Sequence, residues 1–148
     1  MKKIVSLIIC VFATFSLTAC VQNQMDTKPR ITDPHILVEN SDLYDWLKLE
    51  RVNYFKRKDD LLVVEAKFKN TTSFNKSVAY KIDWIDENGF TEKSILSRWI
   101  VTEVEDGRSF VINAISPSTK IKDFEIRLQI PTSDDKNRKD SYHSDYQN

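Results

Sequence analysis

The side chains best suited to covalent or acid–base chemistry are two cysteines, Cys10 and Cys20, and two histidines, His35 and His143. A cysteine thiolate is a strong nucleophile, and a histidine serves as a general base only where the fold holds it in place. Cys10 lies inside an apolar run and Cys20 follows that run, whereas the histidines lie towards the two ends of the remaining chain. The spacing therefore points to chemistry at Cys20 rather than to a catalytic pair.

Cys20 closes a segment with the features of a bacterial export signal. Lys2 and Lys3 precede an apolar run over residues 4–15, and Leu17-Thr18-Ala19-Cys20 follows. A basic start, a short apolar core and small residues are typical of a secretory signal, and the run is too short to cross about 30 Å of hydrocarbon. The last four residues resemble the lipobox of bacterial lipoproteins. This predicts cleavage between Ala19 and Cys20 and lipid attachment at Cys20; the alternative is an ordinary secretory signal that leaves a free thiol.

Lipid attachment at Cys20 would also set the location of the protein. Bacterial lipoproteins carry a diacylglyceryl thioether and usually a third acyl chain, such as palmitate, on the amine. Two or more acyl chains anchor a protein stably to a bilayer. Val21, rather than an aspartate, follows Cys20. By resemblance to sorting in enterobacteria, this favours the outer membrane, with the rest of the chain facing the periplasm.

The remaining composition argues against several classes of function. The chain has 22 basic and 22 acidic residues, and loss of the signal leaves a slight acidic excess, which argues against nucleic-acid binding. One histidine near each end and no free cysteine leave no pattern for a hydrolase or a zinc site. We therefore expect no enzyme: no catalytic residues, no metal, no cofactor and no small-molecule substrate. The expected partners are the membrane, through the lipid on Cys20, and an unidentified periplasmic protein.

Composition also divides the chain into four parts. Residues 1–19 are the predicted signal, and residues 20–35 are polar, with two prolines, and are expected to form the lipidated end and a flexible tether. Residues 36–132 form the predicted domain. Residues 133–148 contain no aliphatic residue and are expected to be a disordered polar tail.

Apolar and polar residues alternate in several segments of the predicted domain, which is typical of strands with one buried face. The predicted inward sets are Leu62, Val64, Ala66 and Phe68; Val78, Tyr80, Ile82 and Trp84; and Phe124, Ile126, Leu128 and Ile130. Residues 47–55 alternate once a bulge near Glu50-Arg51 is allowed. Residues 109–115 are apolar on both faces, which predicts a central or doubly covered strand.

Two glycines mark the predicted turns. Gly89 follows Asn88 and Gly107 follows Asp106, and such pairs favour type I′ hairpins, in which both central residues take positive φ. Residues 90–99 fit either a strand or a single helical turn, with the strand preferred. Strands that recur at short intervals without a helical period predict an all-β fold, an antiparallel immunoglobulin-like sandwich of about seven strands.

Three segments of the predicted domain resemble YcfL-like periplasmic lipoproteins, whose shared domain has no assigned function. These segments are FKNTTS at residues 68–73, YKIDWIDENGF at residues 80–90 with Trp99 following, and ISPSTKIKDFEIRLQ at residues 115–129. The resemblance runs from about Leu49 to Pro131. It implies a sandwich-like domain in the periplasm, and it implies no catalytic residues and no particular partner.

Two local patterns are interpreted as structural. The acidic residues before Gly89 suggest a calcium loop, but the first and twelfth positions would be Trp84 and Ile95, which are not calcium ligands, so a solvated hairpin tip is preferred. Asn70-Thr71-Thr72 matches a glycosylation sequon and is interpreted as a hydrogen-bonded turn.

Arg98 and Trp99 combine two residue types that are common in binding hot spots. This pair is the candidate partner contact, and packing of Trp99 within the domain is the alternative.

Three functions follow as hypotheses. The first is an accessory binding module of envelope machinery, the second is a structural envelope lipoprotein without a single client, and the third is an enzyme. An exposed, uncharged sheet edge would support the first hypothesis. A fully protected edge with an all-polar surface would support the second, and a cleft that holds buried carboxylates would support the third.

Overall fold

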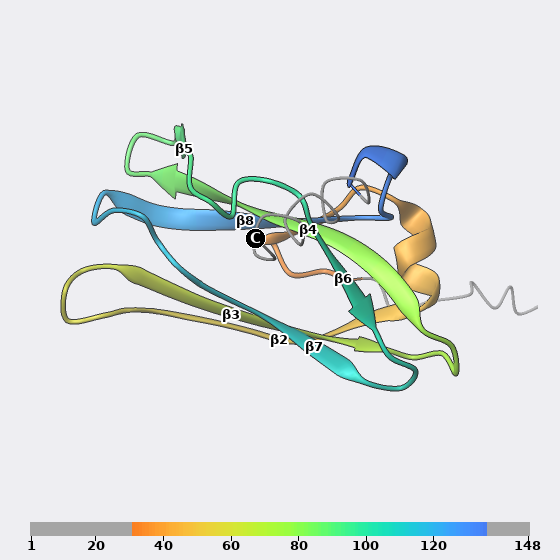
Figure 1. The fold of residues 1–148 in the computed structure, drawn as a ribbon. Helices are drawn as coiled ribbons and strands as arrows, with labels where there is room; N and C mark the ends of the chain where they lie inside the picture. The colour runs from red at the N-terminus through yellow and green to blue at the C-terminus, as the bar shows by residue number, and fades with distance from the viewer. Residues whose placement is uncertain (1–30, 136–148) are drawn as a thin grey trace, which may run out of the picture.

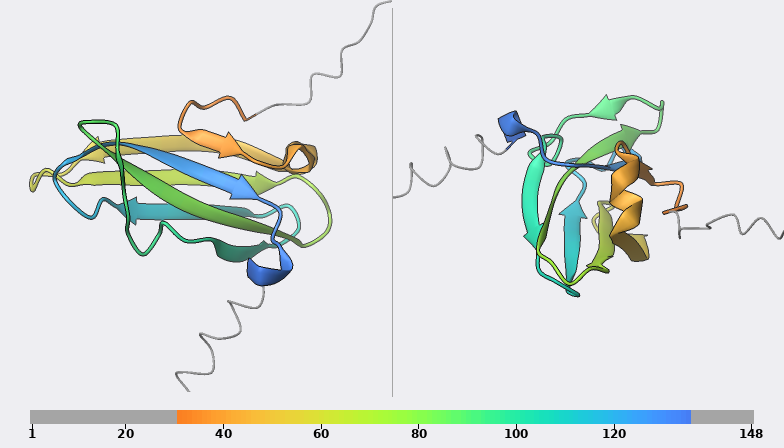
Figure 2. Two further views of the ribbon diagram at one scale, coloured as in Figure 1. Left: turned by 90° about the horizontal axis from the view of Figure 1, so that it is seen from above. Right: turned by 90° about the vertical axis from the view of Figure 1, so that its right-hand side faces the viewer.

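Two β-sheets pack face to face in the computed structural model, which describes residues 31–135 (Figure 1, Figure 2). The strands are β1 (Ile36–Val38), β2 (Leu47–Lys56), β3 (Leu62–Asn70), β4 (Lys76–Asp86), β5 (Thr91–Glu92), β6 (Ile100–Val104), β7 (Ser109–Ile115) and β8 (Ile121–Gln129). One sheet has the order β1-β8-β4-β5, with β6 also paired to β4, and the other has the order β2-β3-β7. The predicted all-β sandwich is confirmed, with eight strands among the described residues.

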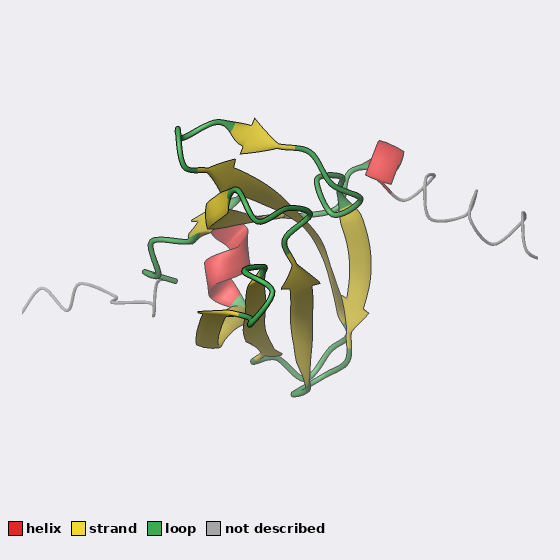
Figure 3. Cartoon of the chain, turned by 90° about the vertical axis from the view of Figure 1, so that its left-hand side faces the viewer, coloured by secondary structure: helices red, strands yellow, loops and turns green. Residues whose placement is uncertain are grey.

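Strand pairing is antiparallel with one exception. β1 runs parallel to β8, with Ile36 opposite Ile126, so the larger sheet is mixed. A short 3₁₀ helix, η2 (Ser41–Asp45), follows β1 and inserts the fully buried Leu43 into the core. Figure 3 shows this helix lying against the strands of the sandwich.

The predicted inward residues form the core. Val64, Phe68, Ile82 and Trp84 are all fully buried between the sheets, because successive side chains of a strand point to opposite faces. The inward set on β8 is one residue shorter than predicted, since Ile130 follows the end of the strand and is exposed.

The bulge predicted in β2 is also present. The register of β2 against β3 shifts between Leu49 and Arg51. The extra residue lets Leu47 and Val52, which lie on opposite sides of the shift, both pack on the hydrophobic core.

Both ends of the folded domain lie outside the predicted limits of 36–132. Ile31 belongs to the hydrophobic core, so the fold begins within the segment predicted to be a tether. Residues 133–135 begin a helical turn, in which Asp135 is buried and accepts hydrogen bonds from Thr132 and Gln129. The rest of the predicted tether and tail, with the signal, Cys20 and His143, lies outside the described residues.

The two glycine turns differ from the predicted type. Gly89 and Gly107 have φ of +84° and +62°, but Asn88 and Asp106 do not have positive φ, so neither turn is type I′. The first joins β4 to β5. The Asp86 amide donates to the Phe90 carbonyl, and the three residues between these two end on the left-handed Gly89. The second joins β6 in one sheet to β7 in the other, and is therefore not a hairpin tip.

Two predicted strands take other forms. β7 pairs with β3 alone among the described strands, and its outward residues Val111 and Ile115 are 41% and 49% exposed. The prediction of a central or doubly covered strand is wrong for the part of the chain that the structure describes, because none of its elements forms a second layer over the outer face of β7. Residues 90–99 form the two-residue β5 and then a loop over residues 93–99, rather than one continuous strand.

Candidate functional site

An apolar groove opens between β7 and the 93–99 loop. It has a volume of about 800 Å³, and its lining residues are Val63, Ser94, Ile95, Leu96, Asn113, Ala114, Ile115 and Pro117. Six of these eight residues are apolar. Binding sites are typically concave and mostly apolar, with few polar groups, so this groove is the candidate functional site.

Hydrogen bonds to β4 hold the 93–99 loop in place. Trp84 Nε1 donates to Ser94 Oγ at 3.1 Å, and the Ile82 amide donates to the Leu96 carbonyl at 2.8 Å. Between these two attachment points, Ile95 is 80% exposed. A side chain presented by a fixed backbone loses little conformational freedom on binding, so Ile95 is well placed to contact a partner.

The groove is bordered by an open strand edge. At the two ends of the pairing between β7 and β3, the Ser116 amide donates to the Leu62 carbonyl and the Asn70 amide donates to the Arg108 carbonyl. Because bonded and non-bonded pairs alternate along antiparallel strands, the odd-numbered residues of β7 direct their backbone N–H and C=O groups away from β3. Within residues 31–135, no strand pairs with those groups.

The predicted partner contact lies beside this site and not in it. Arg98 is exposed and Trp99 is half-buried at the end of the 93–99 loop, and neither lines the groove. Lys81 Nζ lies 5.5 Å from the centroid of the Trp99 ring and 3.0 Å from Asp83 Oδ2. Trp99 therefore contacts Lys81 of β4, and the groove is lined by other residues.

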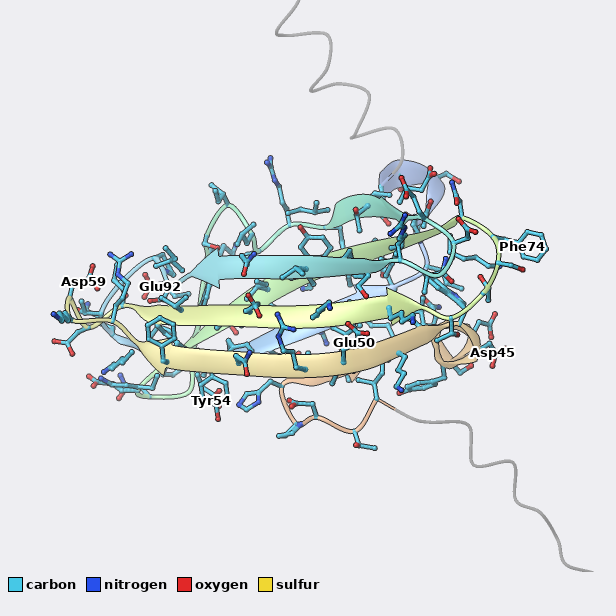
Figure 4. The ribbon with its side chains drawn as sticks, turned by 90° about the horizontal axis from the view of Figure 1, so that it is seen from below. Asp45, Glu50, Tyr54, Asp59, Phe74 and Glu92 are labelled. Carbon is cyan, nitrogen blue, oxygen red and sulfur yellow. The ribbon has the colours of Figure 1, made fainter. Side chains whose placement is uncertain are left out.

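His35 belongs to a second cluster, at the opposite edge of the sheets. Its Nδ1 lies 3.1 Å from Asp33 Oδ1 and its Nε2 lies 3.3 Å from Asp123 Oδ1. The imidazole ring stacks on the ring of Phe124, with 4.6 Å between the ring centroids. It makes an edge-type contact with the ring of Tyr54, with 5.0 Å between the centroids; Tyr54 is labelled in Figure 4. His35 lies in the segment predicted to be a flexible tether, but the fold holds it in place through these contacts.

The cause of that position is the parallel pairing of β1 with β8, which brings residues 33–35 beside the start of β8. A neutral imidazole carries one N–H, so in that form only one of the two carboxylates receives a hydrogen bond. Both ring nitrogens face carboxylates, and His35 does not line the groove. These contacts attach residues 33–35 to the sandwich.

Asn70 has the structural role that its sequence context indicates. It is fully buried, and its side-chain Nδ2 lies 2.7, 3.1 and 3.2 Å from the carbonyl oxygens of Phe74, Val104 and Glu105. The two N–H groups of Nδ2 donate to these three acceptors, so one hydrogen is shared. Its Oδ1 accepts from the amide and hydroxyl of Thr72. These bonds confirm the interpretation as a hydrogen-bonded turn. They also fix the loop that exposes Phe74 at one end of the sandwich (Figure 4).

Asp86 is likewise used by a turn rather than by a metal. Its Oδ1 accepts hydrogen bonds from the amides of Phe90 at 2.8 Å and Asn88 at 2.9 Å. The hydrogen bond from Phe90 is the largest influence on this carboxyl and lowers the pKa of Asp86.

In residues 31–135, no three His, Cys, Asp or Glu side chains are grouped so that they could hold a metal ion. That part of the chain also contains no helix with the length and apolarity needed to span a membrane.

Comparisons with known proteins identify a family and a fold. The model of a family described as "Protein of unknown function (DUF1425)" matches residues 34–130. No curated protein matches the sequence. The crystal structure of Campylobacter jejuni cj0090 is similar, with a TM-score of 0.56 and 20% identity over 67% of this chain and 100% of that chain. A DUF1425 family member from Shewanella sp. pv-4 gives a TM-score of 0.52 and 17% identity over 59% of this chain and 80% of that chain. At these identities, the likeness establishes the fold alone.

Proposed function

Because the chain belongs to the DUF1425 family, whose members are described only as proteins of unknown function, we propose a function from its own sequence and surface. The protein is a lipid-anchored binding module of the YcfL-like kind, faces the periplasm from the outer membrane, and works by holding a protein partner rather than by catalysis. The sequence supports the anchor, and the apolar groove supports the binding role.

The N-terminal sequence supports the anchor. Leu17-Thr18-Ala19-Cys20 follows a basic start and a short apolar run, as in bacterial lipoproteins. Ten residues separate Cys20 from Ile31, where the folded domain has begun. A fully extended chain of that length reaches about 35 Å, so the tether would keep the domain near the membrane surface.

The observation that carries the binding role is the apolar groove beside an uncharged strand edge. β7 contains no charged residue, its last residue Ile115 is exposed, and Ile95 of the neighbouring loop is exposed as well. Removal of apolar surface from water contributes roughly 25 cal/mol per Å², and contiguous exposed apolar surface marks interaction sites. An exposed, uncharged edge is the feature that favours a binding module over the other two hypotheses.

The alternatives receive less support from the same surface. A structural lipoprotein without a client would have a protected edge and a polar surface, whereas Phe74, Phe90 and Ile95 are all exposed. An enzyme would present carboxylates in its cleft. The buried carboxylate of Asp135 instead accepts hydrogen bonds from Thr132 and Gln129, and none of the described residues that line the groove is acidic.

Crosslinking in intact cells, followed by purification of the tagged full-length chain, tests this proposal. Ile95→Lys should abolish recovery of the crosslinked partner, because a charge replaces the exposed apolar side chain of the groove. Phe74→Lys is the matched control, since Phe74 is similarly exposed, at 71%, on a different loop. Equal recovery of the same proteins with both variants and the parent would overturn the groove as the binding site. A thermal melt of each variant verifies that it folds.

A further inference from the structure

β7 differs from every other edge strand among the described residues. Natural sheets protect their edges by short strands, charges and bulges. β1 and β5 have only three and two residues, and β6 contains Glu103. β2 contains four charged residues and a bulge. The seven residues of β7 have no charge, no proline and no register shift against β3.

We propose that the open edge of β7 pairs with β7 of a second copy of this chain. The two strands run antiparallel about Ile112, so that two three-stranded sheets join into one of six strands. The inference goes beyond the proposed function, because it requires no other protein, although it uses the edge that borders the apolar groove.

The register follows from the backbone groups that face the open edge. These belong to Ser109, Val111, Asn113 and Ile115, as the pairing with β3 dictates. Pairing about Ile112 sets Val111 opposite Asn113 of the second copy, and Ser109 opposite Ile115. All four residues of each strand then find a partner for both backbone groups. Outward side chains meet outward side chains, as in any continuous sheet.

The charges that flank β7 favour an antiparallel arrangement with a second copy as the occupant. Glu105, Asp106 and Arg108 precede β7, Lys120 follows it, and all four are exposed. Pairing about Ile112 sets Arg108 opposite Ser116 and brings Glu105 and Asp106 of each copy towards Lys120 of the other. A parallel pair in register would instead bring each of these charges towards the same charge of the second copy. Like charges that face each other across strands are destabilising, and the uncharged β7 places none within the pair itself.

Cysteine crosslinking in the full-length chain tests the pairing directly, because residues 31–135 contain no cysteine. Two differently tagged copies, one with Val111→Cys and one with Asn113→Cys, are expressed together and oxidised in membranes. Opposed residues of a bonded antiparallel pair lie about 5.5 Å apart at Cα, within the range that a disulfide spans. The mixed product should form in preference to either like pair. The parent chain measures any disulfide that forms through Cys10 or Cys20. Asn53→Cys on β2 measures the disulfide that forms by random collision between copies.

The mass of the detergent-solubilised protein gives a second measure. The parent should have twice the protein mass of Asn113→Lys, in which an exposed residue becomes an edge-protecting charge without any change to the core. Ile95→Lys should lose the client of the proposed function and keep the Val111–Asn113 crosslink, so the two proposals fail separately. A monomeric parent, a crosslink no stronger than that of Asn53→Cys, a preferred Val111–Val111 product, or capture of a different protein would each overturn the pairing.

Discussion

Trp84 and Ser94 are joined by a hydrogen bond of 3.1 Å from the indole Nε1 to the serine Oγ. Trp84 is fully buried on β4, whereas Ser94 lines the apolar groove on the 93–99 loop. A second bond, from the Ile82 amide to the Leu96 carbonyl, attaches the same loop to the same strand. The shape of the groove therefore depends on a core residue that does not line it.

Substitution of Trp84 should separate its packing from its hydrogen bond. Trp84→Ala should lower the free energy of unfolding by about 3–5 kcal/mol, as expected for a large aromatic residue removed from a core. Trp84→Phe keeps an apolar ring but removes the donor to Ser94. It should accelerate hydrogen exchange at the Ile82 amide, which bonds to the loop. Denaturant unfolding and amide exchange measure the two effects, and a native-like Trp84→Ala would contradict the core position.

Gly89 should matter for its backbone conformation and not for space. Its φ is +84°, and a Cβ added there would meet no atom within 4 Å. Gly89→Val should therefore cost on the order of 1–3 kcal/mol from backbone strain, whereas Gly89→Asn should cost much less, because asparagine tolerates positive φ. Thermal melts of the two variants make the comparison. Equal melting temperatures would show that the turn does not require the left-handed conformation.

Asp86 should give the β4–β5 hairpin an acid-sensitive contribution. Amide hydrogen bonds lower the pKa of this carboxyl below its ordinary value of 3.8. A lowered native pKa means that the ionised form stabilises the fold above pH 3.8, and that this contribution is lost as the pH falls through the native pKa. Asp86→Asn should therefore lower the melting temperature at pH 7 and have a smaller effect near pH 2. A difference that is constant with pH would contradict the role of the charge.

The parts of the fold with one buried face were accessible from the sequence. Alternation identified the inward residues of β3 and β4, and the mismatch around Glu50 identified the bulge of β2, because both follow from a two-residue period. The same logic failed for β7. Apolar residues on both faces are equally compatible with a covered strand and with an exposed edge, and only the arrangement of the sheets distinguishes the two.

The candidate site and the separate His35 cluster both depend on contacts between distant segments. Ile95 lies in a stretch that fits either a strand or a helical turn, and its exposure follows from the bonds that Trp84 and Ile82 make to the loop. His35 lies at the end of a polar segment, and its place against Asp123 follows from a parallel pairing across some ninety residues. The alternation of apolar and polar residues within one segment predicts neither the exposure of Ile95 nor the contact of His35 with Asp123.

Asn70 should be essential for stability, because it connects two loops through its buried amide. Asn70→Ala would leave the carbonyls of Val104 and Phe74 and the amide of Thr72 without their side-chain partner. A buried polar group left unpaired costs about 1–3 kcal/mol, so denaturant unfolding should show at least a loss of that size. Asn75→Ala, at an exposed asparagine of the same loop, is the control and should have a smaller effect. Equal losses would show that the burial of Asn70 is unimportant.

Membrane attachment should depend on Cys20 alone. The motif Leu17-Thr18-Ala19-Cys20 predicts that the thiol is the site of lipid attachment, and stable anchoring requires two or more acyl chains. Cys20→Ser should therefore release the protein from washed membranes or leave an uncleaved precursor, and labelling with a fatty acid should be lost. Cys10→Ser is the control, because Cys10 lies within the predicted signal and should not affect labelling. A Cys20→Ser protein that is cleaved normally and stays on membranes after a salt wash would show that something other than the lipid holds the chain there.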